Sequence, residues 1–292
     1  MHFKPLTLAT VCLMAGMTAV SQAFLFYGVN LTGNLITFDS ATPGTINSSV
    51  GITGLQSGER LVGLDFRPGT TELYGLGQTS RLYSINTTTG VATAIGSQFS
   101  TLLQGTAFGF DFNPVNGEIR VTSNVNQNMR INRTTGAVIG VDTNLSYMAG
   151  DENFGQVPGI VASSYTNSFA GAGSTQLFDI DAALDSLALQ NGNTGLLDTI
   201  GFLGTNPSNI TDLDIIWNGS TNLAFFSTNL PGSAVATFHT VNLSTGVSGL
   251  VGDIGGGSRV TVIASPVPEP ATMAILGLGA LGLLRRRRRK AA

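Results

Sequence analysis

A short polar segment that ends in glycine recurs along the chain, and this repeat limits the fold more than any other feature of the sequence. Residues 85–90 (INTTTG) return as 131–136 (INRTTG) and 241–246 (VNLSTG), with looser copies at 38–44 and 191–195. The glycines that close the copies are Gly44, Gly90, Gly136, Gly195 and Gly246, at intervals of 46 to 59 residues. Glycine adopts the positive φ that such turns need, so each copy predicts a tight turn between two strands.

A second element recurs upstream of these turns. Residues 61–68 (LVGLDFRP) match residues 107–114 (AFGFDFNP), and weaker copies lie at 160–167, 213–218 and 259–266. These nearly uncharged runs predict buried strands at the centre of the fold. The next strands of the repeats are expected at 72–77, 118–123, 176–181 and 223–228. Four strands in a repeat of this length indicate the blade of a β-propeller.

The number of repeats predicts an all-β, five-bladed β-propeller-like domain over residues 24–265. Residues 24–29 correspond to the second strand of a blade, and residues 259–264 supply the first, so the two ends would complete one blade. Such closure removes exposed sheet edges, which are a liability of β folds. Six blades or an irregular β-sandwich stay open as alternatives.

The N-terminal residues 1–23 have the form of a secretory signal peptide. A weakly basic start is followed by an apolar run and then by small residues at the cleavage position. Cys12, the only cysteine of the chain, lies in this segment. The mature chain would therefore have no thiol for disulfides, catalysis or metal binding.

The C-terminal segment 266–292 combines a proline-rich start, an apolar stretch and a basic tail. An apolar helix over 271–284 would be about 21 Å long at ~1.5 Å per residue, shorter than the ~30 Å hydrocarbon core of a bilayer. The basic tail 285–290 would stay on the cytoplasmic side. Such a helix suits recognition during export better than permanent anchoring, although a plain membrane anchor is an alternative.

This segment resembles the PEP-CTERM sorting signal of Gram-negative bacteria. The residues that carry the resemblance are Val267, Pro268, Glu269, Pro270, Arg285, Arg286 and Arg287. The resemblance implies signal peptidase and an exosortase-type enzyme as processing partners, with transient contact with the inner membrane. It also implies delivery to the cell surface or to the exopolysaccharide matrix.

The body of the chain resembles a second family. The strings GLDFRP (63–68), RLYSIN (81–86), NMRIN (128–132) and YTNSFAGA (165–172) are similar to the bacterial domain-of-unknown-function family 4394. The resemblance covers most of residues 24–265. It implies a propeller-like extracytoplasmic domain, and it supplies no catalytic or binding residue.

The charge of the body argues against nucleic-acid binding. Between residues 24 and 265 the chain has sixteen acidic residues, seven arginines and no lysine. Neutralising phosphates requires clusters of lysine and arginine. Nucleic acid is therefore not an expected partner.

Three aspartates are candidate catalytic residues. Asp65 and Asp111 occupy the same position in two repeats, and Asp214 lies close to it in a third. Inner strands of a propeller converge on its axis, where two such carboxylates could serve glycoside hydrolysis. Alternatively, each aspartate caps the turn that follows it by accepting backbone hydrogen bonds. The repetition favours the structural alternative, because a catalytic acid is needed once.

Two other groups of polar residues are candidates for binding. Asp142, Asp151, Glu152 and Asn153 lie in the longest polar connection between repeats, residues 142–158, where oxygen ligands would suit calcium. No other cofactor is expected.

Arg120 and Arg130 flank an asparagine-rich hairpin and have the donors to bind sugars or carboxylates, with packing between blades as the alternative. His239 is the only histidine of the mature chain, so metal sites with several histidines are excluded.

These features predict an exported protein of the cell surface or exopolysaccharide matrix that acts as a binding or structural module. Its partner would be exopolysaccharide or a surface protein. An extracytoplasmic carbohydrate- or lactone-active hydrolase that uses Asp65, Asp111 or Asp214 is the alternative. The sequence leaves open whether the protein is an enzyme.

Overall fold

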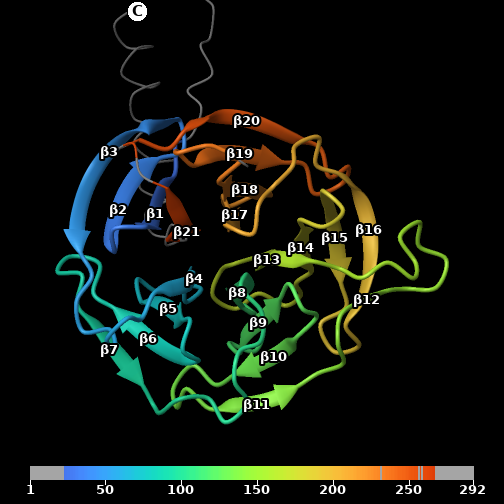
Figure 1. Ribbon diagram of the computed structural model, residues 1–292, viewed down its shortest axis with the longest axis horizontal. Helices are drawn as coiled ribbons and strands as arrows, with labels where there is room; N and C mark the ends of the chain where they lie inside the picture. The colour runs from blue at the N-terminus through green and yellow to red at the C-terminus, as the bar shows by residue number, and fades with distance from the viewer. Residues whose placement is uncertain (1–22, 231, 256, 258, 267–292) are drawn as a thin grey trace, which may run out of the picture.

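The computed structural model describes residues 23–230, 232–255, 257 and 259–266. In this part of the chain all helices and strands assigned are strands, with no helix among them. The strands form five sheets around a common axis (Figure 1). The predicted signal peptide, apart from Ala23, and the predicted C-terminal apolar helix lie outside the described residues. Within the described ranges, no helix is long and apolar enough to cross a membrane.

Each sheet is one blade of a five-bladed β-propeller, which confirms the predicted fold and blade number. We number the blades I to V along the chain and give the strands from the axis outward. Blade II contains β4 (Leu61–Phe66), β5 (Leu73–Gly77), β6 (Arg81–Ile85) and β7 (Ala92–Ile95). Blade III contains β8 (Phe108–Phe112), β9 (Ile119–Ser123), β10 (Asn128–Ile131) and β11 (Val138–Val141). Blade V contains β17 (Thr211–Trp217), β18 (Asn222–Thr228), β19 (Thr237–Val241) and β20 (Ser248–Asp253).

Blade I joins the two ends of the chain, as the repeats predict. Its strands are β21 (Val260–Ala264), β1 (Leu25–Asn30), β2 (Asn34–Asp39) and β3 (Thr42–Gly51). The interface with blade V is filled by aromatic rings: the centroids of Phe26 and Phe238 are 5.0 Å apart, and those of Phe225 and Phe238 are 5.4 Å apart. Such contacts add to the stabilisation from the apolar area they bury. This interface therefore holds the terminal strands in the ring.

Blade IV has one strand more than the repeat predicts. Its antiparallel strands are β13 (Ile160–Tyr165), β14 (Leu177–Asp181), β15 (Ser186–Gln190) and β16 (Leu196–Phe202). The short strand β12 (Ser146–Tyr147) pairs in parallel with β16 at the rim. Tyr147 also donates a hydrogen bond from its hydroxyl to Asp181 at 2.6 Å. The first part of the expected polar connection 142–158 is therefore part of a blade.

The glycines that close the repeats lie where neighbouring blades touch at the rim. Gly90 and Gly136 have φ angles of +72° and +67°. A Cβ atom at these positions would collide with the backbone carbonyl oxygens of Gly51 and Ile95, in the outer strands of the preceding blades. The outer strands run around the rim in Figure 1, so each one ends against the turn of the next blade. Glycine is therefore required both for the turn and for the contact.

Candidate functional site

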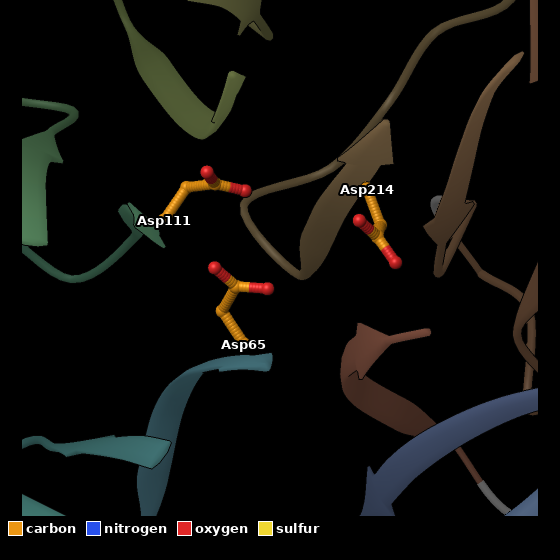
Figure 2. A group of neighbouring side chains, drawn as sticks. All are labelled: Asp65, Asp111 and Asp214. Carbon is orange, nitrogen blue, oxygen red and sulfur yellow. The ribbon is translucent and has the colours of Figure 1, made fainter. Parts of the chain in front are cut away.

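The three aspartates predicted as an axial group do lie together. Asp65 is on β4, Asp111 on β8 and Asp214 on β17, which are inner strands of three blades. Figure 2 shows their carboxylates converging, and one oxygen from each lies within 4.8 Å of the others. All three side chains are buried, with at most 5% of each residue exposed. The strand repeat therefore places them side by side although they are far apart in sequence.

Each of these carboxylates accepts a hydrogen bond from the following blade, either from its inner strand or from the residue just after it. Asp65 Oδ2 accepts from the amide of Phe112 at 2.8 Å. Asp111 Oδ1 accepts from Tyr165 at 3.2 Å, and Asp214 Oδ2 accepts from Ser265 at 2.6 Å.

The donors are the amides on the free edges of the inner strands, which have no neighbouring strand to bond. The aspartates were expected to cap the turns that follow them. Their acceptors serve the next blade, and the amides of Phe66 and Ile215, next in sequence to Asp65 and Asp214, also bond these two carboxylates.

Blades IV and I have other residues at the position that aspartate occupies in blades II, III and V. In blade IV, Ser164 takes the place of the aspartate: its Oγ donates to Asp111 at 2.8 Å and accepts from the amide of Ile215 at 3.0 Å. In blade I, the equivalent residue is Ala264, which has no acceptor. Among the residues that the structure describes, axial hydrogen bonds therefore join four of the five blade interfaces, and none of this kind joins blade I to blade II.

Burial and mutual repulsion make these carboxylates hard to ionise. Burial, followed by the charges of Asp111 and Asp214, raises the pKa of Asp65 well above its ordinary value. Burial and the charge of Asp214 do the same for Asp111, and burial raises the pKa of Asp214 itself to about 7. Desolvation disfavours the charged form of a carboxyl group, and a like charge nearby adds to that effect. The group therefore retains protons near neutral pH.

Blade V contributes a fourth carboxylate close to this group. Asp212 Oδ2 accepts a hydrogen bond from the amide of Ile263 at 2.8 Å. Burial raises the pKa of Asp212 well above its ordinary value. Blade V is thus bonded to blade I through Asp212 and Asp214 together.

The spacing of the axial carboxylates limits what they could do chemically. Glycosidases that use two carboxylates hold them about 5–5.5 Å apart for retention, or 6.5–9.5 Å for inversion, with the substrate between them. Here the oxygens lie within 4.8 Å and the side chains are buried. Asp65, Asp111 and Asp214 could together contact one divalent cation, which takes oxygen ligands at about 2.3–2.6 Å. Their hydrogen bonds favour a role in joining blades over hydrolysis.

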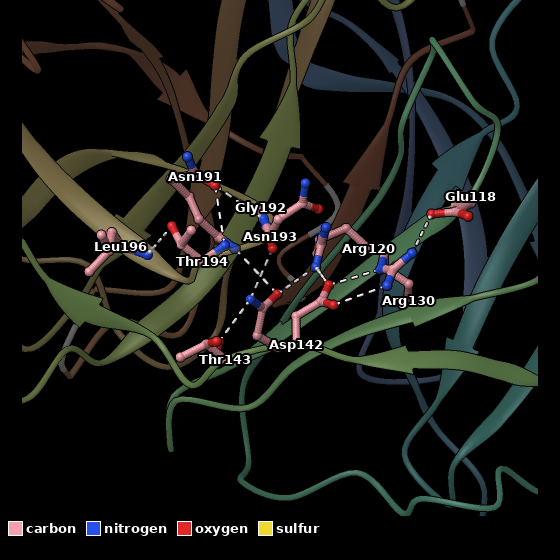
Figure 3. Close-up of polar contacts among 12 residues, drawn as sticks. Glu118, Arg120, Arg130, Asp142, Thr143, Asn191, Gly192, Asn193, Thr194 and Leu196 are labelled. Carbon is pink, nitrogen blue, oxygen red and sulfur yellow. Dashed lines mark hydrogen bonds and ion pairs between the residues drawn. The ribbon is translucent and has the colours of Figure 1, made fainter.

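A second polar cluster lies between blades III and IV (Figure 3). Arg120 Nη1 donates to Asp142 at 2.6 Å and to Asn128 at 2.7 Å. Arg130 donates two hydrogen bonds to the same Asp142, at 2.9 and 3.0 Å, and a third to Glu118 at 3.3 Å. Burial opposes ionisation of Asp142, but the hydrogen bonds from Arg130 and Arg120 lower its pKa. The two candidate arginines therefore share one carboxylate.

Asn128 connects this cluster to blade IV. Its Nδ2 donates to the carbonyl oxygens of Thr143 and Gly192, at 3.1 and 3.2 Å. Gly192 belongs to the turn between β15 and β16, so the cluster joins the two blades. Of the two arginines, Arg120 also contacts blade IV, because its Nε donates to the hydroxyl of Tyr165 at 3.3 Å. The partners of Arg130 given above all belong to blade III or to the residue that follows it.

The same cluster forms part of the wall of an open cleft between blades III and IV. The cleft consists of two adjoining cavities, with volumes of about 530 and 270 Å³. The residues that line both cavities are Asn113, Arg120, Tyr165 and Asn193. Arg130 lines the smaller cavity only. Both predicted ligand-binding arginines therefore face a cleft, although most of their donors are already bonded.

The residues predicted to bind calcium are used differently. Asp142 pairs with the two arginines, whereas Asp151 accepts hydrogen bonds from the amide and hydroxyl of Thr199 at 2.6 and 2.8 Å. Asn153 donates to the same hydroxyl at 3.0 Å. Across the described ranges, the group of three carboxylates with the spacing of metal ligands is the axial one. Calcium binding at Asp142, Asp151, Glu152 and Asn153 remains a prediction.

Ser164, Asp212 and Asn128 were not identified from the sequence as site residues. Ser164 could have been found, because it occupies the aspartate position in the copy at 160–167. No sequence signal identifies Asp212 or Asn128, since their partners come from other blades.

His239, the lone histidine, is buried against Phe226, with ring centroids 4.7 Å apart. It therefore packs inside blade V.

The geometry defines the class: a five-bladed β-propeller whose inner strands are joined by axial side chains. The chain belongs to the family described as Domain of unknown function (DUF4394), whose model matches residues 34–264. Residues 266–289 match the PEP-CTERM protein-sorting motif. Both resemblances noted in the sequence are thereby confirmed. The motif marks an exported protein that is processed by exosortase-type machinery.

Several solved structures are similar in fold. A chain of the nidogen/laminin complex aligns with a TM-score of 0.51 and 10% identity, covering 84% of this chain and 99% of that one. Hydrazine synthase of Kuenenia stuttgartiensis aligns with a TM-score of 0.38 and 9% identity, over 72% and 52% of the two chains. The Dos1 propeller gives 0.38 and 15%, over 77% and 57%. No curated protein matches this chain in sequence. These likenesses concern the fold alone.

Proposed function

We propose that this exported propeller acts as a binding module for exopolysaccharide at the cell surface or in the extracellular matrix, through the cleft between blades III and IV. The observation that carries the proposal is the set of free amides in that cleft. The side chains of Gln176 and Asn193 are exposed and make no hydrogen bond within the described part of the chain. Amides both donate and accept, which suits the hydroxyl groups of a sugar.

The same cleft also has apolar side chains. Met148 and Leu196 line its larger cavity and are 39% and 41% exposed. Apolar side chains of this kind can cover the C–H faces of a sugar ring, because burying that surface releases water. An open cleft with free amides and apolar side chains supports the binding of a polymer of sugars.

The rigidity of the cleft also supports binding. Asn128 donates to the carbonyl oxygen of Gly192 and Arg120 to the hydroxyl of Tyr165, so both side chains join blade III to blade IV. Arg130 holds Asp142 within blade III. A pre-formed site loses less conformational entropy when a ligand binds. The arginines would thus position the cleft, while the amides contact the ligand.

The test measures binding of the purified protein to the exopolysaccharide of its producer by isothermal titration calorimetry. Asn193→Ala removes one free amide without breaking a hydrogen bond inside the protein, and we expect it to weaken binding by about threefold to tenfold. Thr88→Ala changes the equivalent turn position of blade II, away from the cleft, and serves as the matched control. Equal effects of the two variants would refute the cleft as the binding site.

The hydrolase alternative is tested in the same samples by measuring reaction products. New reducing ends, or opened lactone, that are lost in Asp65→Asn and Asp111→Asn variants would assign catalysis to the axial aspartates. Binding without product supports the module.

A further inference from the structure

A separate cavity opens on the axis where the inner strands begin. Its volume is about 230 Å³, and blades I, II, III and V contribute to its wall. Leu61, Phe108 and Thr211, the first residues of β4, β8 and β17, all line it. Asp65 and Asp111 are the next-to-last residues of their strands. The cavity therefore lies toward the opposite end of the inner strands from those two aspartates, and it shares no lining residue with the cleft.

Several polar side chains that line this cavity are already bonded to the protein. Glu59 accepts hydrogen bonds from the amide of Thr79 at 2.8 Å and from the hydroxyl of Tyr83 at 3.1 Å, in addition to the hydroxyl of Thr79. Thr261 donates its hydroxyl to the carbonyl oxygen of Val29 at 3.0 Å.

Thr211 likewise donates to the carbonyl oxygen of Ser208 at 2.7 Å. The remaining wall includes Val62, Ala107 and Ile210. A polar ligand group placed deep in this cavity would lose its bonds to water and find few partners, at a cost in free energy. We therefore expect the part of a ligand that enters the cavity to be mainly apolar.

The rim of the cavity is different. Arg60 and Asn209 are exposed, and neither side chain makes a hydrogen bond or ion pair within the described ranges. The guanidinium of Arg60 therefore keeps its donors for a ligand, and its planar fork matches a carboxylate. The adjacent Glu59 is occupied by its three donors. Glu59 is buried and held by neutral donors, so the exposed charge at the rim is that of Arg60.

We propose that this cavity binds a small amphiphilic anion. Its apolar chain enters the cavity, and its carboxylate or comparable head group pairs with Arg60 and accepts from the amide of Asn209. The site is independent of the polysaccharide cleft, and it would give the propeller a second ligand of a different chemical class.

Three probes of the same chain length test the proposal: octanoate, octylamine and 1-octanol, titrated into the purified protein by calorimetry. We expect octanoate to bind most tightly, because only its head group complements Arg60. Arg60→Ala should weaken octanoate binding about tenfold and leave octanol binding unchanged. Arg60→Glu should reverse the preference in favour of octylamine.

Arg67→Ala is the matched control, because Arg67 follows the other end of β4 and pairs with Glu72 on the surface. It should not change the affinity for any of the three probes. Thermal melting of each variant shows that the fold is intact, as expected for exposed positions. The proposal is wrong if none of the probes binds, if octylamine binds the unaltered protein more tightly than octanoate, or if Arg60→Ala leaves the octanoate affinity unchanged.

Discussion

The carboxylate of Asp65 in blade II accepts a hydrogen bond at 2.8 Å from the amide of Phe112 in blade III, 47 residues further along the chain. Equivalent bonds run from the amide of Tyr165 to Asp111 and from that of Ser265 to Asp214. An inner strand of a propeller has a free edge that faces the axis, where its amides have no strand partner. The repeated aspartate supplies the missing acceptor from the neighbouring blade, and this makes it part of the joint between blades.

The first prediction concerns the loss of that acceptor. Asp111→Ala would leave the amide of Tyr165 and the hydroxyl of Ser164 without their partner, and we expect a loss of about 1–3 kcal/mol in the free energy of unfolding. Asp111→Asn keeps an acceptor of the same shape and should lose much less. Urea denaturation of both variants measures the difference. Similar losses in the two variants would show that the hydrogen bond contributes little.

The second prediction concerns pH. Asp65, Asp111, Asp212 and Asp214 have raised pKa values in the folded state, to about 7 for Asp214. Between about pH 4, where an unfolded aspartate titrates, and the folded pKa, the native state binds more protons than the unfolded state. Stability therefore falls as the pH rises through this interval. The melting temperature should be higher at pH 5 than at pH 8.

Asp179, whose pKa burial raises to about 7, acts in the same direction as the axial aspartates. His239 acts in the opposite direction, because burial lowers its pKa, but it is one group against five raised aspartates. Asp142 also acts in the opposite direction, since its pKa is lowered, but its contribution is lost only at more acidic pH. Replacing the axial aspartates Asp65, Asp111 and Asp214 with asparagine should flatten the dependence between pH 5 and 8. A melting temperature that increases from pH 5 to pH 8 would contradict the assigned protonation.

The third prediction concerns the interface that lacks an axial acceptor. Ala264 stands where Ser164 stands in blade IV, so Ala264→Ser would place a hydroxyl beside the amide of Phe66, which has no acceptor in blade I. We expect it to stabilise the protein by about 0.5–1.5 kcal/mol, the net value of one hydrogen bond. Ala264→Val adds volume without an acceptor to a buried position, and should destabilise it. Chemical denaturation decides between these outcomes, and a loss of stability in the serine variant would refute the proposed equivalence.

The fourth prediction concerns the glycines of the rim. Gly136→Ala adds the strain of a positive φ and also a collision with the carbonyl oxygen of Ile95. Gly204 has a similar φ of +73°, but its Cβ would meet nothing within 4 Å. Gly204→Ala should cost about 1–2 kcal/mol from conformation alone, and Gly136→Ala should cost clearly more. Equal losses of melting temperature in Gly136→Ala and Gly204→Ala would mean that the contact with Ile95 at the rim adjusts without loss of stability.

Much of the architecture could be predicted because it depends on local sequence patterns. The glycine spacing gave five blades, and the match between residues 61–68 and 107–114 placed Asp65 and Asp111 at equivalent positions. Both follow from regularities that short stretches of sequence preserve. The strand β12 could not be predicted in this way, because two residues paired with β16 have no periodic pattern of their own.

The partners of the site residues were decided by tertiary structure. From the sequence, Asp65 is an acceptor close to a turn, and the amide of its own turn is the nearest candidate. In the folded protein the amide of Phe112 is the donor, because the blades place inner strands next to one another around the axis. Within blade III, Asp142 likewise meets two arginines that lie 12 and 22 residues before it in the sequence, because β9 and β10 pack beside β11.

The sequence by itself determined the repeat, the all-β class, the closure of the ring by its two ends and the sorting signal, since each depends on residues close together or on simple periodicity. Tertiary structure alone decided which carboxylates meet, which acquire raised pKa values and where the cavities open. Those properties depend on distance and burial, and in this propeller both arise when strands about fifty residues apart are packed around one axis.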